Sequence, residues 1–209
     1  MSLFRGLVWV IAVTLTACGP DPGEDARSRD LPVAELEGLG DTAASRIRLA
    51  MEAAGSEPRQ ARTVGEYAMI LHAYRQLDVA DPAYELARAL EEGPDPWALY
   101  HGVLLLDTDR PREALQAFEA AEDGQVATVY QARALLADDR PSEAVALLLQ
   151  VLEEAPERVD ALLELAAIRQ QSGDFAAAET YYRKALDGQQ GLAEAHYGLA
   201  QALRATGQE

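Results

Sequence analysis

Residues 159–192 carry the clearest hydrophobic pattern in the chain, and it predicts two helices joined by a tight turn. Apolar and small side chains recur at steps of three and four from Leu162 through Leu165 to Ala166. This spacing places them on one face of an α-helix. The polar stretch around Gly173 then ends that helix and begins another. The second helix continues the same steps at Ala178, Tyr182 and Ala185.

Small residues stand at fixed places in this segment. With Val159 as position 1, alanine occupies positions 8, 20 and 27, glycine position 15 and tyrosine position 24. Two helices that cross closely leave no room for a side chain larger than a methyl group at the crossing points. This spacing resembles the tetratricopeptide repeat, a pair of antiparallel helices in about 34 residues. The resemblance implies an all-α, right-handed superhelix whose concave wall is made by the first helix of each pair.

The same pattern, read along the chain, predicts four repeats and a final half repeat. The repeats are expected near 64–94, 95–124, 125–158 and 159–192, followed by a single C-terminal cap helix in 193–209. Strong internal evidence comes from a turn that is used twice, because Asp-Arg-Pro at 109–111 recurs at 139–141. A lone first helix at the end of such an array would cover the apolar face of the last full repeat.

The first repeat is the weakest match. It is expected to begin near Val64, which puts Leu71 at position 8 in place of a small residue. Asp81 and Pro82 are expected to open its second helix, as N-cap and first helical residue. With these boundaries the first two repeats are shorter than the two that follow. The two short spacings leave the packing angle between the first repeats undetermined.

Two segments precede the repeats. Residues 18–32 are rich in proline, glycine and acidic side chains, and we expect them to form a flexible tether. The following region, 33–62, contains an apolar stripe that predicts a helix over 41–54, with Asp41 as N-cap and Gly55 as the stop. This helix lacks a convincing repeat pattern, and we therefore interpret it as an N-terminal cap.

The start of the chain, 1–17, predicts an export signal. Arg5 is followed by an apolar run at 6–15 that is shorter than the roughly 20 residues of a membrane-spanning helix. The four residues ending at Cys18 resemble the bacterial lipobox, in which the thiol is acylated, with palmitate among the acyl chains, and the preceding peptide is removed. Gly19 after the cysteine resembles lipoproteins sent to the outer membrane and facing the periplasm. The alternatives are an ordinary secretory signal that contains a cysteine, or a buried thiol.

Charge and composition limit the partners. The chain has 35 acidic and 18 basic residues, a formal net charge of -17. Nucleic acid or a bare anionic lipid surface would be repelled within the Debye length of about 8 to 10 Å. A protein with basic patches is easier to reconcile with this charge, although the acidity also serves solubility. With one cysteine in the chain, no intramolecular disulfide can form.

No motif typical of an enzyme or metal site is present in the sequence, so we predict no catalytic residue, metal or cofactor. The three histidines fall on predicted repeat helices. His101 and His196 occupy packing positions, and we interpret them as satisfied, half-buried groups. His72 is expected to face the concave wall.

The resemblance also implies where a partner would bind, because the family's groove positions are 2, 5, 9, 12 and 13 of the first helices. The predicted groove residues are His72, Leu99, Val103, Leu106, Val129, Arg133, Leu136, Leu163, Ala167, Gln170, Tyr197, Gln201 and Arg204. This wall would be apolar in its middle, which favours an extended segment or an amphipathic helix as ligand. The alternative is that neighbouring repeats cover these residues.

Together these features predict an envelope lipoprotein that acts as a protein-interaction adaptor or assembly factor, and not an enzyme. The alternative is a permanent structural subunit of an envelope complex, with its groove filled in the assembly. A monomer that binds peptides in isolation would favour the first hypothesis, and an obligate oligomer the second.

Overall fold

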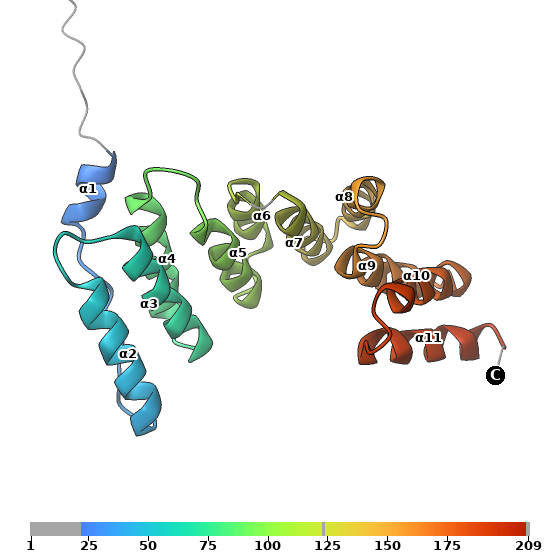
Figure 1. Cartoon of the computed structure of the whole chain (residues 1–209), viewed down its shortest axis with the longest axis horizontal. Helices are drawn as coiled ribbons and strands as arrows, with labels where there is room; N and C mark the ends of the chain where they lie inside the picture. The colour runs from blue at the N-terminus through green and yellow to red at the C-terminus, as the bar shows by residue number, and fades with distance from the viewer. Residues whose placement is uncertain (1–21, 123, 208–209) are drawn as a thin grey trace, which may run out of the picture.

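The structure, a computed structural model, describes residues 22–122 and 124–207 and is built from α-helices (Figure 1). In these residues there are eleven helices and no β-strand. They are α1 (Pro22–Ser28), α2 (Asp41–Ala54), α3 (Ala61–Ala73), α4 (Leu77–Leu90), α5 (Trp97–Asp107), α6 (Pro111–Glu119), α7 (Gly124–Ala137), α8 (Pro141–Glu154), α9 (Val159–Gln171), α10 (Phe175–Gly188) and α11 (Ala193–Ala205). The prediction of an all-α fold is confirmed.

The helices from α3 onward pack in consecutive pairs (Figure 1). In each repeat a first helix (α3, α5, α7 or α9) packs on a second helix (α4, α6, α8 or α10), and α11 follows as a further first helix. Neighbouring first helices contact one another, whereas within the described ranges no two neighbouring second helices do. The array therefore curves with its first helices on the inner side, as in a tetratricopeptide superhelix.

A left-handed residue recurs at the turn after each first helix of the array. It is Arg75, Asp109, Asp139, Gly173 and Gly207, with φ between 58° and 79°. The spacing between successive members is constant except between Asp109 and Asp139, where it is shorter. Gly173 is position 15 of its repeat. The other four residues therefore mark position 15 of their own repeats, and this defines where each repeat begins.

The register of the first repeat was predicted wrongly by three positions. With Arg75 at position 15 the repeat begins at Ala61, and not at Val64. Ala68 then occupies position 8 and is fully buried, as the repeat pattern requires. The remaining packing positions 20, 24 and 27 are the buried Ala80, Tyr84 and Ala87.

The second helix of this repeat also begins earlier than predicted. Helix α4 starts at Leu77, so Pro82 lies inside it and does not open it. Proline in that place removes one backbone hydrogen bond of the helix, but burial of Ala80, Ala83 and Tyr84 on either side of it holds the helix together. Asp81 therefore does not cap the helix, and its carboxylate contacts His101 of α5.

The second repeat is the short one. Its helix α6 has 9 residues, against 14 in α4, α8 and α10. The short spacing between Asp109 and Asp139 corresponds to the loss of about one helical turn. The shortening therefore removes a turn of helix and leaves the packing positions Ala114 and Phe118 in register and buried.

The expected tether at residues 18–32 is not extended over its described part. Residues 22–28 form α1, which packs on α4, and Ala26 is completely buried there. The exposed Arg27 pairs with Glu92, and the hydroxyl of Tyr67 donates a hydrogen bond to the Pro32 carbonyl at 3.0 Å. A single small residue is enough for this contact because a methyl group fits a closely packed helix surface.

Helix α2 covers the residues expected for the N-terminal cap helix, with Ile47 and Ala54 buried against α3. Its N-cap is Gly40 and not Asp41, which is the first helical residue. The predicted signal peptide and Cys18 lie outside the described residues. Among the described helices, none is both long and apolar enough to cross a membrane.

Candidate protein-binding wall

The first helices meet along one side of the array, which we call the inner wall, and polar side chains bridge them there. From the turn after α3, Arg75 donates from Nη1 to Oδ2 of Asp107, the last residue of α5, at 2.7 Å. Between α7 and α9, Arg133 donates from Nε to Glu164 Oε1 at 2.6 Å. Between α9 and α11, Gln170 donates from Nε2 to Gln201 Oε1 at 2.6 Å.

His72 lies on this wall, although through a different register position than expected. In the observed register it is position 12 of its repeat and not position 9, and both positions belong to the groove set. Its Nε2 lies 3.3 Å from Asp107 Oδ2, and its ring meets the Tyr84 ring edge-on with centroids 6.2 Å apart. His72 is thus a half-buried part of the bridge to α5.

The apolar middle predicted for this wall is partly covered. Val129 is 2% exposed and belongs to the core between α7, α8 and α9, so its assignment to the groove was wrong. Leu148 of α8 and Leu165 of α9 belong to the same buried cluster. The other aliphatic members of the predicted set are half-buried and pack partly against core clusters. They are Leu99, Val103, Leu106, Leu136 and Leu163.

The accessible groups of the inner wall are aromatic, cationic and amide side chains. Tyr197 on α11 is 67% exposed. On α7 the Arg133 guanidinium lies 4.8 Å from the centroid of the Tyr130 ring and keeps 39% of its side chain exposed. Arg204 is exposed, and Ala167, Gln170 and Gln201 are half-buried between them.

Several wall residues were missed by the sequence analysis. Tyr130 and Glu164 are the partners of the predicted groove residue Arg133, and Met69 at position 9 of the first repeat is 38% exposed. Met69 could have been found with the correct register. The partners could not, because a bridge between helices depends on how neighbouring repeats are oriented.

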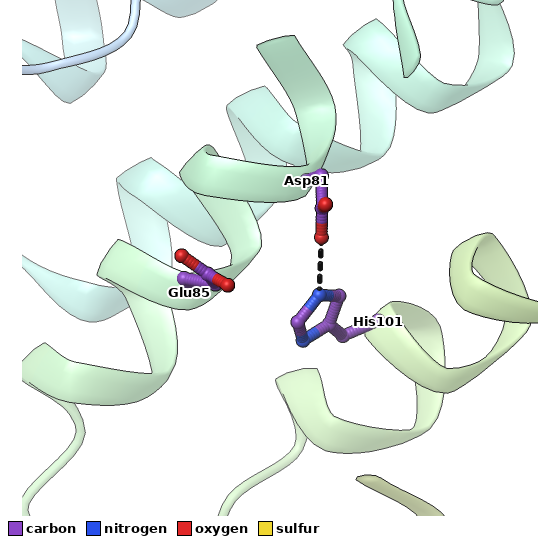
Figure 2. A group of neighbouring side chains, drawn as sticks. All are labelled: Asp81, Glu85 and His101. Atoms are coloured by element: carbon purple, nitrogen blue, oxygen red, sulfur yellow. Dashed lines mark hydrogen bonds and ion pairs between the residues drawn. The ribbon is translucent and has the colours of Figure 1, made fainter. Parts of the chain in front are cut away.

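A second polar cluster joins α4 to α5 away from this wall, and Figure 2 shows its three residues Asp81, Glu85 and His101. His101 is 5% exposed. Its Nε2 lies 2.7 Å from Asp81 Oδ1, and its Nδ1 lies 3.2 Å from Arg88 Nη1. Because arginine can only donate, Nδ1 is the acceptor, and the neutral ring donates from Nε2 to Asp81.

Burial and charge act together on this cluster. Burial lowers the pKa of His101 and outweighs the opposite effect of its hydrogen bond to Asp81. For Asp81 burial favours a higher pKa, but the hydrogen bonds from His101 and Arg110 together lower it. The cluster therefore holds a neutral imidazole beside an ionised carboxylate. The prediction that His101 is a satisfied packing residue agrees with these contacts.

The same three residues bring possible metal ligands within 4.8 Å of one another, so we tested the fit of a cation. A cation on His101 Nε2 would move the ring proton to Nδ1, where it would face the donor groups of Arg88. It would also compete with Arg110, whose guanidinium is paired with Asp81. The donor set does not fit a metal ion, and we interpret the cluster as a polar junction between the first two repeats.

His196 differs from the prediction that it is a half-buried packing residue. It is exposed, and its Nε2 lies 2.8 Å from the Gln190 carbonyl oxygen. Position 4 of a first helix is normally covered by the second helix of the same repeat, and no second helix follows α11 within the described ranges. The prediction from position alone was therefore wrong.

With this geometry in place, the chain can be compared with known proteins. A family model described as tetratricopeptide repeat matches residues 135–182, from the end of α7 into α10. The matched segment is therefore a tetratricopeptide repeat, and the described array has the fold of a tetratricopeptide superhelix. No curated protein matches the chain.

Several solved structures share this fold at low sequence identity. PilW, described as a widely conserved type IV pilus biogenesis factor, is 18% identical, with a TM-score of 0.67 over 81% of this chain and 88% of PilW. PilF of Pseudomonas aeruginosa is 18% identical, with a TM-score of 0.65 over 90% of this chain and 87% of PilF. YrrB, described as having an unusual peptide-binding site, is 17% identical, with a TM-score of 0.56 over 78% of this chain and 86% of YrrB.

Proposed function

We propose that the protein is a membrane-anchored envelope lipoprotein whose tetratricopeptide array is an adaptor or assembly factor for a protein complex. The observation that carries this proposal is the row of accessible side chains on the inner wall of α7, α9 and α11. Arg133 lies on α7, Gln170 on α9, and both Tyr197 and Gln201 on α11, and the bridges from α7 to α9 and from α9 to α11 place them on the same side of the array. Tyrosine and arginine are the side chains that most often dominate the energy of protein interfaces.

The chemistry of this wall favours a protein segment as the ligand. The guanidinium groups and the half-buried amides of the wall can bond to backbone carbonyls and carboxylates of an extended segment, and Tyr197 offers apolar area for a side chain. The leucines of the wall are half-buried in the array, so the ligand would use these polar contacts in addition to the aliphatic contacts expected from the sequence. No group of the described wall is arranged for catalysis, and we assign none.

The descriptions of similar folds support an adaptor. PilW is described as a biogenesis factor of the type IV pilus, and YrrB as a protein with a peptide-binding site. Neither description names a chemical reaction, and that of YrrB names a peptide as the ligand.

The proposed location of the protein in the cell depends on its first residues. In the proposal Cys18 is acylated and holds the array on the outer membrane, facing the periplasm, since each buried methylene of an acyl chain contributes about 0.8 kcal/mol. Cys18→Ser should leave the chain either unprocessed or free in the envelope. Membrane fractionation with unchanged size and unchanged membrane association would contradict the lipid anchor.

Recognition by the inner wall can be tested with three alanine variants. Arg133→Ala and Tyr197→Ala should each weaken binding of a protein that copurifies with the parent chain by tenfold or more, about 1.4 kcal/mol. Leu149→Ala removes a side chain that is 39% exposed on the second helix α8 and serves as the matched control. Equal binding by all three, with unchanged melting curves, would place recognition outside the inner wall.

A further inference from the structure

The two ends of the array present complementary halves of one repeat. At the N-terminal end, α2 packs on α3 in the way that a second helix packs on the first helix of the next repeat. The packing residues of the second helix α4 are Ala80, Ala83, Tyr84 and Ala87, all buried against their own first helix. The equivalent residues one full repeat earlier in the chain are Arg46, Leu49, Ala50 and Ala53 of α2.

These four residues of α2 line an open groove instead of a packed interface. The groove has a volume of about 660 Å³ and lies between α2 and α3. Leu49 is 67% exposed in it, and Met69 of α3 is 38% exposed. The face of α2 that should cover a first helix is therefore uncovered among the described residues.

The α3 side of the groove is also a face that normally holds a helix. It includes Thr63, Glu66 and Ile70, at positions 3, 6 and 10 of the repeat. The residues at the same positions of α11 are Ala195, Gly198 and Ala202, which are buried against the preceding repeat. The groove is thus bounded by the two faces that enclose a first helix in the interior of the array.

At the other end, α11 is a first helix with the opposite face uncovered. Leu162, Leu165 and Ala166 of α9, at positions 4, 7 and 8, are buried beneath α10. The residues at these positions and at position 11 in α11 are exposed or half-buried. They are His196, Leu199, Ala200 and Leu203. They form a largely apolar strip that lacks a second helix in the described structure.

We propose that α11 of one copy of this chain occupies the groove between α2 and α3 of a second copy. α11 and α2 then complete a repeat across the contact, and the two arrays continue head to tail. The two copies use different surfaces, so the contact is heterologous and allows further copies to add at each end.

Charge supports this occupant. Within the array Arg133, at position 9 of one first helix, pairs with Glu164 at position 6 of the next. Across the proposed contact the same positions are Gln201 and Glu66, a donor and an acceptor, with the cationic Arg204 one turn further along α11. Arg46 of α2 would meet the C-terminal end of α11, where the helix dipole is negative.

A charge placed in either half tests the contact. In the full chain carrying Cys18→Ser, sedimentation velocity should detect association that grows with concentration. Leu49→Glu and Leu203→Glu should each weaken it by tenfold or more, because a carboxylate would be buried among apolar side chains. Leu149→Glu, on the exposed side of α8, is the matched control and should associate like the parent.

Mixing the two variants gives the sharpest result. The Leu49→Glu chain keeps an intact α11 and the Leu203→Glu chain an intact groove, so a 1:1 mixture should form dimers and nothing larger. Circular dichroism should show both variants folded; if either unfolds, Leu49→Ser and Leu203→Ser replace them. A monomeric parent chain, association unchanged in the variants, or a mixture that stays monomeric would overturn the proposal, including the case in which residues 1–21 or another protein fill the groove.

Discussion

Repeat 1 (61–94) and repeat 4 (159–192) bury the same positions with very different sequence signals. Position 8 is a fully buried alanine in both, and position 24 is a buried tyrosine, Tyr84 in one and Tyr182 in the other. The family model reaches repeat 4 and not repeat 1. Side-chain size at the helix crossings therefore maintains the fold of repeat 1, although this repeat lacks the residues by which the family model recognises repeat 4.

The two repeats differ in what lies against the tyrosine that they share. Tyr84 is stacked on His101, with ring centroids 5.8 Å apart and planes 23° apart, so it belongs to the polar junction. Tyr182 lies against Gly198 of α11, where an added Cβ would come within 2.2 Å of the ring. The junction after repeat 1 contains hydrogen bonds around the Tyr84 ring. At the junction after repeat 4, the Tyr182 ring packs directly on Gly198, which has no side chain.

The largest effect we expect is the loss of either tyrosine. Tyr84→Ala and Tyr182→Ala should each reduce the free energy of unfolding by about 3 kcal/mol or more, since each leaves a cavity at the centre of its repeat. Chemical denaturation measures both. If Tyr182→Ala lowers the free energy of unfolding by less than half as much as Tyr84→Ala does, position 24 is not equivalent in the two repeats.

Overfilling the helix crossing should come next. Ala68→Leu in repeat 1 and Ala166→Leu in repeat 4 should each cost about 1 to 3 kcal/mol, because position 8 has no space for a larger side chain. Ala176→Leu, on the exposed side of α10, is the control and should change the melting temperature little. A silent Ala68→Leu would show that the register of repeat 1 is not the one described.

The two repeats also differ at position 15, which is Arg75 in repeat 1 and Gly173 in repeat 4. Gly173→Arg should destabilise repeat 4 by about 1 kcal/mol, because φ there is 79° and a Cβ is disfavoured at that angle. Arg75→Gly relieves the same strain in repeat 1 but loses the ion pair with Asp107, so the net gain should stay below about 1 kcal/mol. Thermal melts that shift in the same direction for both variants would contradict this interpretation of the turns.

The smallest effect is a pH dependence of the junction around His101. Because burial lowers the pKa of His101, the unfolded chain binds its proton more readily than the folded chain does. The contribution of neutral His101 to the free energy of unfolding should be fully present above the unfolded pKa of about 6.5. It should decrease as the pH is lowered towards about 5. The lowered pKa of Asp81 acts only below about pH 4, so it does not contribute in this window.

His101→Gln provides the control for that pH dependence. Glutamine keeps a hydrogen-bonding group facing Asp81 and Arg88, beside Glu85, but does not titrate. Melting temperatures of this variant should fall less than those of the parent between about pH 7 and pH 5. Parallel curves for the two chains would mean that His101 does not carry the effect.

Much of the helical array could be predicted from sequence, because alanine, glycine and the Asp-Arg-Pro turn mark the repeats locally. Repeat 1 was misplaced by three positions because its left-handed residue is Arg75, which carries no turn signal. A shift of three positions on a helix turns the apolar stripe by only about 60°, so Val64 and Leu71 still gave a plausible pattern.

The inner wall was less predictable than the repeats. Register position identifies the face of a residue, but its burial depends on how closely the neighbouring repeats pack. Val129 is buried where α8 and α9 close over it, whereas Tyr197 is open because it lies on the last described helix. The packing of α1 through Ala26 has the same origin, since one small residue gives no sequence signal of a tertiary contact.

If the first helices, and not the second, recognise the partner, crosslinking in cells should capture it from a first helix alone. A photoreactive amino acid would replace Gln171, exposed at the end of the first helix α9, or Gln150, exposed on the second helix α8. We predict that Gln171 captures one defined protein other than this chain and that Gln150 does not. Capture from Gln150 alone, or the same products from both positions, would contradict the claim.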